Sequence, residues 1–525
     1  MGASRSHDAA QSGPVEALRR TLAWAAGAPW PHGSESGAVE PEALVAALHA
    51  HRLDARFLRR LGEPGAPAVP DAAVRRVRER LDATRERVRR QRELFAELAA
   101  ACPEERLVML KGSTLYAHTG DPDSVRYSGD LDIVAAAPER AVRTAAAALD
   151  LERTADAAVL DEYAGLLHPE LGLIEVHSYF PVPVLPPSVR TGAASPGRNP
   201  GAWRHEACIG EHRLTHADLL ENLADGIPGV LAPELAVIVY AAHLYGDYLR
   251  TMLPLPAGTV RLDEVATVVD LCALPAFRPE RFVRLVDRHR AHDVIGFVRA
   301  LAADVLGLDP FDGVLPPAPD PLFPVDLWWD GVEGFLVDLG WHPWELVVRD
   351  RHPDATLGAL DPAAVPVAPG APAVVTAATA APDTGGRFAH RTEHGTEFAV
   401  TATFTDTGTA LRVRVDVPTV PDDRFTGVAL YFGDNRYEVF HAPAEDGLRL
   451  DDYSTSRTAA GTATVGVERT AQRDELTLEL PWAALAASRT PDGRRLPLLF
   501  AVRQQYLGWG RTAAGLVLPL RLEHS

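Results

Sequence analysis

The chain has 525 residues, a formal net charge of −19 and 46% hydrophobic residues. This length exceeds what one hydrophobic core normally organises, so we expect two or three domains. The acidic excess argues against nucleic-acid partners and against binding to an anionic membrane. No apolar run approaches the ~18 residues of a membrane-spanning helix, and the N-terminus has no apolar signal-peptide core. Because the three cysteines also lack disulfide or metal spacing, we expect a cytoplasmic protein.

Lys111 is the only lysine among the 52 basic residues, and all the others are arginine. This bias is typical of a GC-rich bacterial genome, in which lysine drifts to arginine wherever the two are interchangeable. Lysine is a compact point charge on a slender stem, whereas arginine is a wide planar fork. Lys111 is therefore either a residue of a tight site that rejects arginine or a chance survivor on a surface turn.

Residues 1–14 form a polar tail that we expect to be disordered, and residues 15–105 have a helical pattern. Between 72 and 101, apolar residues recur at spacings of three and four, which predicts one long helix with an apolar face. The opposite face carries nine arginines and three acidic residues between Arg75 and Arg92. Such a face either steers a phosphate-bearing ligand or is only a solvated helix surface.

Residues 106–200 are predicted to form an α/β core. "RLVML" and "DLDIVAA" are typical of short buried strands, "STLYAHTG" of a helical turn, and "PERAVRTAAAALD" of a helix that begins with proline. "EYAGLLH" and "LGLIEVHSYF" predict two further strands. The residues from 181 to 200 are rich in Pro, Gly and Ser and predict a loop.

The remainder of the chain changes character twice. Residues 201–352 are predicted to be mostly helical, and His243 in "VIVYAAHLY" is there either a hydrogen-bonded core residue or a ligand. Residues 353–385 are rich in Pro, Ala and Gly without apolar periodicity, which predicts a linker. Residues 386–525 contain short alternating strands between turns, which predicts an antiparallel β-sandwich. The expected fold class is a multidomain α/β part followed by an all-β domain.

Asp130 and Asp132 are two residues apart on a predicted strand, so both side chains project from one face. Adjacent carboxylates repel each other unless a cation joins them, and hard oxygen ligands suit Mg²⁺ bound together with a nucleotide. The same spacing arises by chance in an acidic chain, as "DPD" at 121–123 shows. The alternative is that Asp130 caps a turn and Asp132 is a surface residue.

Two neighbouring elements strengthen the first interpretation. Gly112 and Ser113 follow a predicted strand and begin a helix, so their N–H groups and the serine hydroxyl can face a phosphate. Glu175 in "LIEVH" lies on another predicted strand, and three carboxylates converge if that strand is next to the Asp132 strand. Phosphoryl-type transfer uses such a set to hold metal ions or to take a proton. The alternative is that Glu175 pairs with an arginine.

His177 shares a strand face with Glu175, so it can orient that carboxylate or contact an acceptor. A core or surface histidine is the alternative. Lys111 immediately precedes Gly112, where a slender cation can approach a triphosphate or stabilise the carboxylates. Alternatively, it is a strand-end lysine that pairs with any nearby acid.

The motifs "VMLKGSTLYA", "VRYSGDLDIVAAAPERA" and "IEVHSYF" occur in this order. They resemble an uncharacterised bacterial nucleotidyltransferase family of the superfamily with the DNA polymerase β-like fold, and the similarity covers roughly residues 15–310. It implies a mixed sheet with helical flanks, an NTP substrate and a Mg²⁺ or Mn²⁺ cofactor. It also implies metal-binding and catalytic roles for Asp130, Asp132 and Glu175, and nucleotide-binding roles for Lys111, Gly112, Ser113, Arg126 and His177.

The chain departs from the superfamily pattern in two places. The third acid is Glu175 rather than an aspartate, which adds a methylene to its reach. The gap between Ser113 and Asp130 is longer than in small antibiotic-modifying members. An inactive nucleotide-binding relative therefore stays an alternative.

The C-terminal sandwich resembles family-9-like carbohydrate-binding modules through "VALYFGDNRYEVF" and "LTLELPWAAL". This resemblance implies a carbohydrate partner. Five aromatic side chains either stack on a sugar or belong to the core: Tyr431, Tyr437, Tyr453, Trp482 and Trp509.

We expect a metal-dependent nucleotidyltransferase that moves an NMP group from an NTP to a hydroxyl or phosphate of an acceptor that the sequence does not identify. One alternative is a noncatalytic nucleotide-binding adaptor whose sandwich binds a glycan or a protein. Another is a metal-dependent glycosyltransferase, whose Asp-x-Asp motif also holds a metal and a sugar nucleotide. The "LKGS" element so soon before Asp130 argues against the glycosyltransferase.

Overall fold

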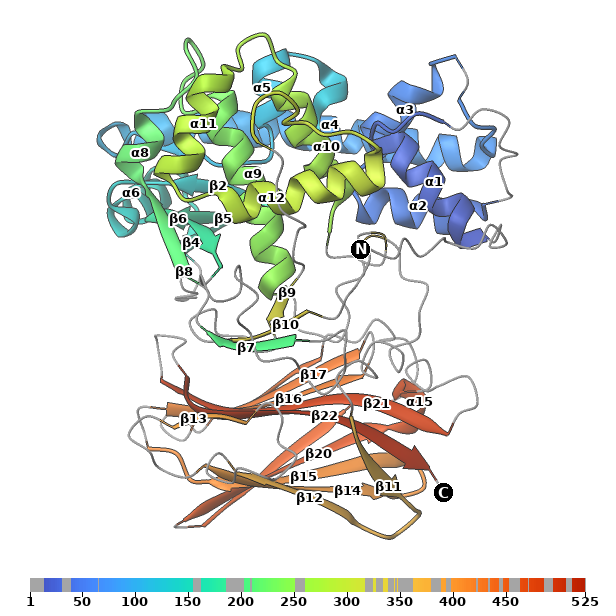
Figure 1. Ribbon diagram of the computed structural model, residues 1–525. Helices are drawn as coiled ribbons and strands as arrows, with labels where there is room; N and C mark the ends of the chain where they lie inside the picture. The colour runs from blue at the N-terminus through green and yellow to red at the C-terminus, as the bar shows by residue number, and fades with distance from the viewer. Residues whose placement is uncertain are drawn as a thin grey trace.

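The computed structural model shows helices and a small mixed sheet in the N-terminal part of the chain and a β-sandwich in the C-terminal part (Figure 1). The structure describes most of the chain, namely residues 14–30, 39–64, 66–153, 162–185, 203–207, 210–250, 260–316, 324–326, 334–338, 344, 347, 362–378, 389–392, 398–421, 424–432, 435–442, 447–452, 463–470, 472–485, 494–506 and 512–524. Residues 1–13 of the predicted tail lie outside the described residues, and residue 14 begins the first helix.

Four helices precede the first strand: α1 (Pro14–Ala26), α2 (Pro41–Ala50), α3 (Asp54–Leu61) and α4 (Asp71–Ala101). The predicted long helix is α4. It buries one stripe of side chains, namely Ala73, Val77, Leu81, Thr84, Val88, Gln91, Leu94, Phe95 and Leu98. Because this spacing follows one face of a helix, the periodicity prediction is confirmed.

The arginines of α4 are largely engaged within the protein. Several pair with acidic side chains: Arg85 with Asp82 and Asp123, Arg89 with Glu86 and Glu93, and Arg90 with Glu86 and Glu170. Arg87 instead donates to backbone carbonyls of the loop before β2. These contacts fit a solvated, internally neutralised helix face rather than a surface that steers phosphate.

A five-stranded sheet forms the centre of the N-terminal part, in the order β1-β2-β5-β4-β3. Its strands are β1 (Val108–Met109), β2 (Leu131–Val134), β3 (Glu152–Arg153), β4 (Glu162–His168) and β5 (Gly172–His177). The β2–β5 pair is parallel and the other neighbours are antiparallel, so the predicted mixed sheet is confirmed. The short connections contain η1 (Pro103–Glu105), α5 (Thr114–Thr119), η2 (Pro122–Ser124) and α6 (Pro138–Leu149).

The region from 201 to 352 contains the predicted helices and also strands that the sequence did not predict. Its helical elements are α8 (His216–Leu220), α9 (Pro233–Arg250), α10 (Leu262–Cys272), α11 (Pro279–Arg288), α12 (His292–Leu301) and the π-helical turn η3 (Ala302–Leu306). β7 (Trp203–Ala207), β10 (Gly334–Asp338) and β9 (Pro324–Asp326) form a small sheet, and β8 (Gly210–Thr215) pairs with β6 (Tyr179–Val184), which precedes this region. The loop predicted from residue 181 is therefore wrong for residues 181–184, which continue β6, and residues 186–200 lie outside the described residues.

The C-terminal part is a two-sheet β-sandwich, as expected. One sheet has the order β11-β22-β21-β16-β17-β18 with β13 beside β22, and the other has the order β12-β14-β15-β20-β19. The strands are β11 (Ala363–Val367), β12 (Ala373–Ala378), β13 (Ala389–Thr392), β14 (Ala399–Asp406), β15 (Ala410–Pro418), β16 (Arg424–Phe432), β17 (Asn435–Ala442), β18 (Gly447–Asp452), β19 (Thr464–Arg469), β20 (Arg473–Pro481), β21 (Arg495–Tyr506) and β22 (Thr512–His524), and α15 (Trp482–Leu485) follows β20. Inward-facing residues of both sheets alternate along the strands and form one core.

The segment predicted as a linker contributes two strands to this sandwich. β11 pairs with β22 in parallel, and β12 pairs with β14 in antiparallel register. The strands of the sandwich therefore begin before residue 386, and one pair departs from the expected antiparallel pattern. Their Ala- and Pro-rich sequences hide the alternation, because only a few side chains of each strand, such as Val365 and Val367, are large and buried.

Three of the five aromatic residues considered for sugar stacking are described, and all three are buried or half-buried. Tyr431 and Tyr437 are buried, and the Tyr431 hydroxyl donates to Glu438 over 2.8 Å. Trp482 packs against the sandwich core and donates through its ring N–H to Asp406 over 2.7 Å. Tyr453 and Trp509 lie outside the described residues. Tyr437 thus belongs to the sandwich core and Trp482 packs against it, whereas Tyr431 projects from the other face of its sheet into the hydrophobic cluster of the N-terminal part.

None of the described helices is long and apolar enough to cross a bilayer. Cys102 and Cys272 are free thiols, and Cys208 lies outside the described residues.

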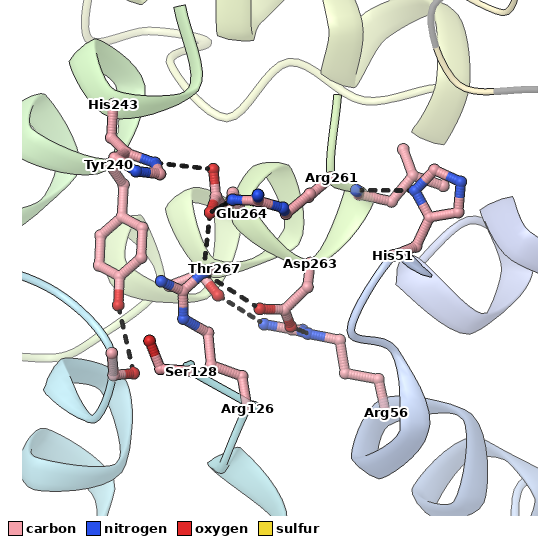
Figure 2. Close-up of polar contacts among 12 residues, drawn as sticks. His51, Arg56, Arg126, Ser128, Tyr240, His243, Arg261, Asp263, Glu264 and Thr267 are labelled. Atoms are coloured by element: carbon pink, nitrogen blue, oxygen red, sulfur yellow. Dashed lines mark hydrogen bonds and ion pairs between the residues drawn. The ribbon is translucent and has the colours of Figure 1, made fainter. Parts of the chain in front are cut away.

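A buried network of charged side chains joins the helices to the loop before β2 (Figure 2). The first turn of α10 supplies Asp263 and Glu264, where acidic groups suit the positive end of a helix. Arg56 of α3 donates to Asp263 over 3.0 Å, and Arg126 donates to Glu264 over 3.1 Å and lies 3.7 Å from Asp263. The Arg126 guanidinium also lies 4.9 Å from the ring centre of Tyr240 on α9.

We expect Arg126→Met to destabilise the N-terminal part by about 3–5 kcal/mol, because it leaves two buried carboxylates without one of their cations. Urea unfolding followed by tryptophan fluorescence measures this change. Arg89→Met is the matched control, since Arg89 also pairs with two glutamates but on an exposed face of α4, where ion pairs contribute at most about 1 kcal/mol. Equal losses in both variants would contradict a structural role for the buried network.

His51, at the end of α2, predicts a second stability effect. Burial lowers the pKa of His51 to about 4 from its ordinary value of 6.5, so the folded state excludes a proton that the unfolded chain accepts. The free energy of unfolding should therefore fall as the pH drops from 6.5 to about 4, by roughly 3 kcal/mol. Urea midpoints across this range test the effect, and His51→Asn should flatten the dependence. An unchanged slope in that variant would assign the acid sensitivity to other groups.

Candidate active site

Strand alternation places the acidic residues of the sheet on one face. On β2, Leu131 and Ile133 belong to the core beneath α4 and α6, so Asp132 between them projects from the opposite face. On β5, Ile174 and Val176 belong to the same core. Glu175 and His177 consequently project to the face that Asp132 shares.

The parallel pairing of β2 and β5 brings these side chains together. Asp132 is opposite Glu175 in the register of the two strands. His177 Nε2 lies 3.6 Å from an oxygen of Asp132 and 3.6 Å from an oxygen of Glu175. One ligand atom from each of the three residues lies within 4.8 Å of the others. Asp132 and Glu175 therefore lie close together, as expected if their strands are neighbours. Glu175 and His177 also project from the same face of β5, as expected.

Lys111 lies against this cluster. It follows β1, where the N–H of Leu110 donates to the carbonyl oxygen of Asp132 over 3.1 Å. The Lys111 Nζ is 3.3 Å from an Asp132 carboxylate oxygen, and only 10% of its side chain is exposed. Burial opposes its charge, but Asp132 and Asp130 outweigh burial and raise the pKa of Lys111. The single lysine of the chain is thus a buried, charged residue rather than a survivor on a surface turn.

The surroundings of Asp132 and Glu175 shift the pKa values of these two carboxylates in opposite directions. Burial opposes the charge of Asp132, yet Lys111 and His177 outweigh it and hold the pKa of Asp132 well below its ordinary value. Burial raises the pKa of Glu175, and the charges of Asp132 and Asp130 add to the rise although a hydrogen bond from His177 opposes it. Glu175 is therefore the carboxylate of this cluster that most readily takes up a proton.

Asp130 lies one residue before β2 rather than on the strand, as a half-buried residue at the edge of the same site. Ser128 donates its hydroxyl to the Asp130 carboxylate over 2.8 Å. Helix α4 holds this loop, because Gln91 donates to the Asp130 carbonyl over 3.1 Å and Arg87 donates to the Ser128 carbonyl over 2.7 Å. Gln91 of the buried stripe of α4 and Arg87 of its arginine-rich face therefore position the loop that carries Asp130, the first carboxylate of the Asp-x-Asp motif.

These residues line a cavity of about 250 Å³. The sheet and its adjoining loops contribute Lys111, Asp130, Asp132, Glu175 and His177 to the lining. The helices and the turns beside them contribute Arg52, His243, Asp247 and Arg261. His243 lies 3.3 Å from Glu264 and 3.7 Å from Asp247, so it is both a partnered residue and a cavity residue. Asp247 and Arg261 pair with each other over 3.2 Å.

Sequence reasoning missed Arg52, Asp247 and Arg261 because they lie on helices and turns far from the sheet motifs. Asp247 is four residues after His243 and so shares its helix face, which is the one signal in the sequence that could have indicated it. Arg52 and Arg261 carry no such signal.

Three predicted nucleotide-binding residues lie outside the cavity lining. Ser113 is buried, and its hydroxyl contacts the Met109 sulfur at 3.2 Å instead of facing open space. Gly112 has a φ of +81°, a conformation that favours glycine, and its carbonyl accepts from the Tyr240 hydroxyl over 3.5 Å. Arg126 is buried in the network with Asp263 and Glu264 (Figure 2). In this structure these residues shape the wall behind the cavity.

Residues 37–177 match the model of a family described as uncharacterised nucleotidyltransferase. No curated protein matches the chain. Two solved structures of a carbohydrate-binding module of family 9 from Caldicellulosiruptor kristjanssonii, one in complex with cellotriose and one with glucose, are similar in structure. They are 10% and 11% identical, with TM-scores of 0.21 and 0.20, and each alignment covers 31% of this chain and 93% or 95% of the module.

The matched segment begins just before α2 and ends at His177, so it contains α2 to α4, the whole five-stranded sheet and the acidic cluster. Residues 37–177 of this chain are therefore similar to the family described as uncharacterised nucleotidyltransferase.

Proposed function

We propose that the cavity binds an NTP together with a divalent cation and transfers its nucleotidyl group to a hydroxyl or phosphate of an acceptor. The observation that carries this proposal is the side-by-side placement of Asp132 and Glu175, with Asp130 and His177 beside them, within the segment that matches the family. The helices after the sheet contribute His243, Asp247 and Arg261 to the lining of this cavity.

The donor set fits Mg²⁺ or Mn²⁺. Carboxylate oxygens are the ligands that these hard cations prefer, and the imidazole of His177 suits Mn²⁺ as well. Asp132, Glu175 and His177 would hold the ion, and Asp130 lines the same cavity. When bound, the ion would neutralise phosphate charge and polarise the oxygens around it.

The chain's own residues supply the remaining steps. The acceptor oxygen forms a bond to the α-phosphorus as the bond between that phosphorus and the bridging oxygen of pyrophosphate breaks, and pyrophosphate leaves. The acceptor proton goes to the carboxylate oxygen of Glu175 that does not hold the ion, since the Glu175 side chain is 17% exposed and that of Asp132 only 4%. Lys111 keeps Asp132 ionised, and His177 holds the two carboxylates in position.

Thermal unfolding with each NTP, in the presence and absence of Mg²⁺, tests nucleotide binding. We expect a metal-dependent rise in the unfolding temperature, since a ligand at 100 times its dissociation constant adds about 2.7 kcal/mol of stability. Asp132→Asn and Glu175→Gln should abolish the rise. The matched control is Asp123→Asn, which alters the "DPD" sequence outside the cavity, where Asp123 pairs with Arg85. A full rise in Asp132→Asn would contradict the assignment, and binding without pyrophosphate release would favour the adaptor.

Lys111→Arg tests whether a slender cation is required. The guanidinium is wider than the ammonium, so it should displace Asp132 or the bound phosphates. Because a displacement of about 1 Å can cost 100-fold in rate, we expect pyrophosphate release to fall by a factor of about 10 to 100. The unfolding temperature without ligand should change little, because the charge is kept. Wild-type turnover in this variant would show that the site accepts arginine and that the lysine has no special role.

A further inference from the structure

Arg52 occupies a backbone position that normally requires glycine. It follows His51, the C-cap residue of α2, and has a φ of +57°, in the left-handed region. Its N–H donates to the His49 carbonyl over 3.0 Å, and the N–H of Leu53 donates to the Leu48 carbonyl over 2.9 Å. This pair of bonds is the helix-ending motif in which glycine is the usual residue, because an L side chain there is crowded by the backbone.

The side chain of Arg52 lines the cavity without a carboxylate partner. Lys111 pairs with Asp132, Arg261 pairs with Asp247 and Glu264, and His177 and His243 each lie beside two carboxylates. Within the described part of the chain, Arg52 makes no side-chain hydrogen bond or ion pair. Burial and the neighbouring Arg126 and Arg261 lower the pKa of Arg52 more than the carboxylates of Glu264 and Asp130 raise it, so its surroundings on balance oppose its charge.

A half-buried guanidinium in such surroundings is stabilised when an anion binds beside it. Phosphate oxygens suit the planar fork of arginine, which can donate two parallel hydrogen bonds. The cavity also needs added positive charge, because Asp130, Asp132 and Glu175 would repel a polyphosphate chain. A strained backbone residue retained at a cavity wall agrees with a binding role.

We propose that Arg52 binds the polyphosphate chain of the NTP, in the same cavity as the acidic cluster. This inference rests on the proposed function. It assigns the triphosphate contact to the turn between α2 and α3, rather than to the Gly112–Ser113 turn, whose hydroxyl is engaged with Met109.

The chain contains a matched control for Arg52. Arg290 follows α11 in the same helix-ending motif, with a φ of +52° and hydrogen bonds from Arg290 to Asp287 and from Ala291 to Val286. Arg290 is exposed and does not line the cavity. The two arginines therefore share backbone strain and differ in their surroundings, so comparing them separates binding from helix capping.

The test measures dissociation constants of ATP with Mg²⁺ and of inorganic triphosphate for the full-length wild type and for Arg52→Gly, Arg52→Lys and Arg290→Gly. We expect Arg52→Gly to weaken both ligands by about 10- to 100-fold, the loss of charge-assisted hydrogen bonds. Arg52→Lys should retain part of the affinity, and Arg290→Gly should retain all of it. The unfolding temperature of Arg52→Gly without ligand should be unchanged or higher, because glycine suits this conformation.

The outcomes separate the two proposals. If the wild type binds ATP with Mg²⁺ and Arg52→Gly binds it equally well, the inference about Arg52 is overturned while the proposed function stands. If Arg52→Gly loses affinity only together with a lower unfolding temperature, and Arg52→Lys loses just as much, the residue acts structurally and the inference is overturned too. If the wild type binds neither ligand, the proposed function itself fails.

Discussion

The site depends on two carboxylates that the backbone holds side by side. The parallel register of β2 and β5 places Asp132 opposite Glu175 on the same sheet face, and Asp132 is only 4% exposed. Two such charges in a poorly solvated place repel each other strongly. The arrangement persists because Lys111 and His177 lie within 3.3 to 3.6 Å of the carboxylate oxygens, and because the alternating residues of both strands are fixed in the core beneath α6.

The surrounding helices hold this pair of strands and the loop before β2 in place. Helix α4 contributes Leu94, Phe95 and Leu98 to the core that it shares with the sheet. It also uses Arg87 and Gln91 to hold the loop that presents Asp130. Helix α10 supplies Asp263 and Glu264, which fix Arg126 just before that loop. The family match contains α4 and the sheet but ends before α10. The contacts that hold the site therefore extend beyond the matched segment.

Local patterns predicted four of the five strands of the sheet but not β3, and they made the acidic cluster depend on a neighbouring position of β2 and β5 that only the structure shows. Apolar alternation gave the strands, and alternation also assigned Glu175 and His177 to one face before their neighbours were known. The same reasoning failed for Ser113 and Arg126, because a short motif does not reveal whether a side chain faces the cavity or the core. Ser113 contacts Met109, and Arg126 is buried among acids. Arg52, Asp247 and Arg261 reach the site through tertiary packing of distant helices, and β11 and β12 were hidden by their Ala- and Pro-rich composition.

The most direct measurement is the position of bound Mn²⁺ in a crystal of the protein grown with Mn²⁺ and a nonhydrolysable NTP analogue, located by anomalous scattering. If Asp132 and Glu175 form a cation and nucleotide site, a Mn²⁺ ion will lie about 2.0–2.6 Å from oxygens of both residues, with the triphosphate beside it. A cavity that stays free of Mn²⁺ at saturating concentrations, or an ion bound only elsewhere, would contradict a metal-dependent transferase.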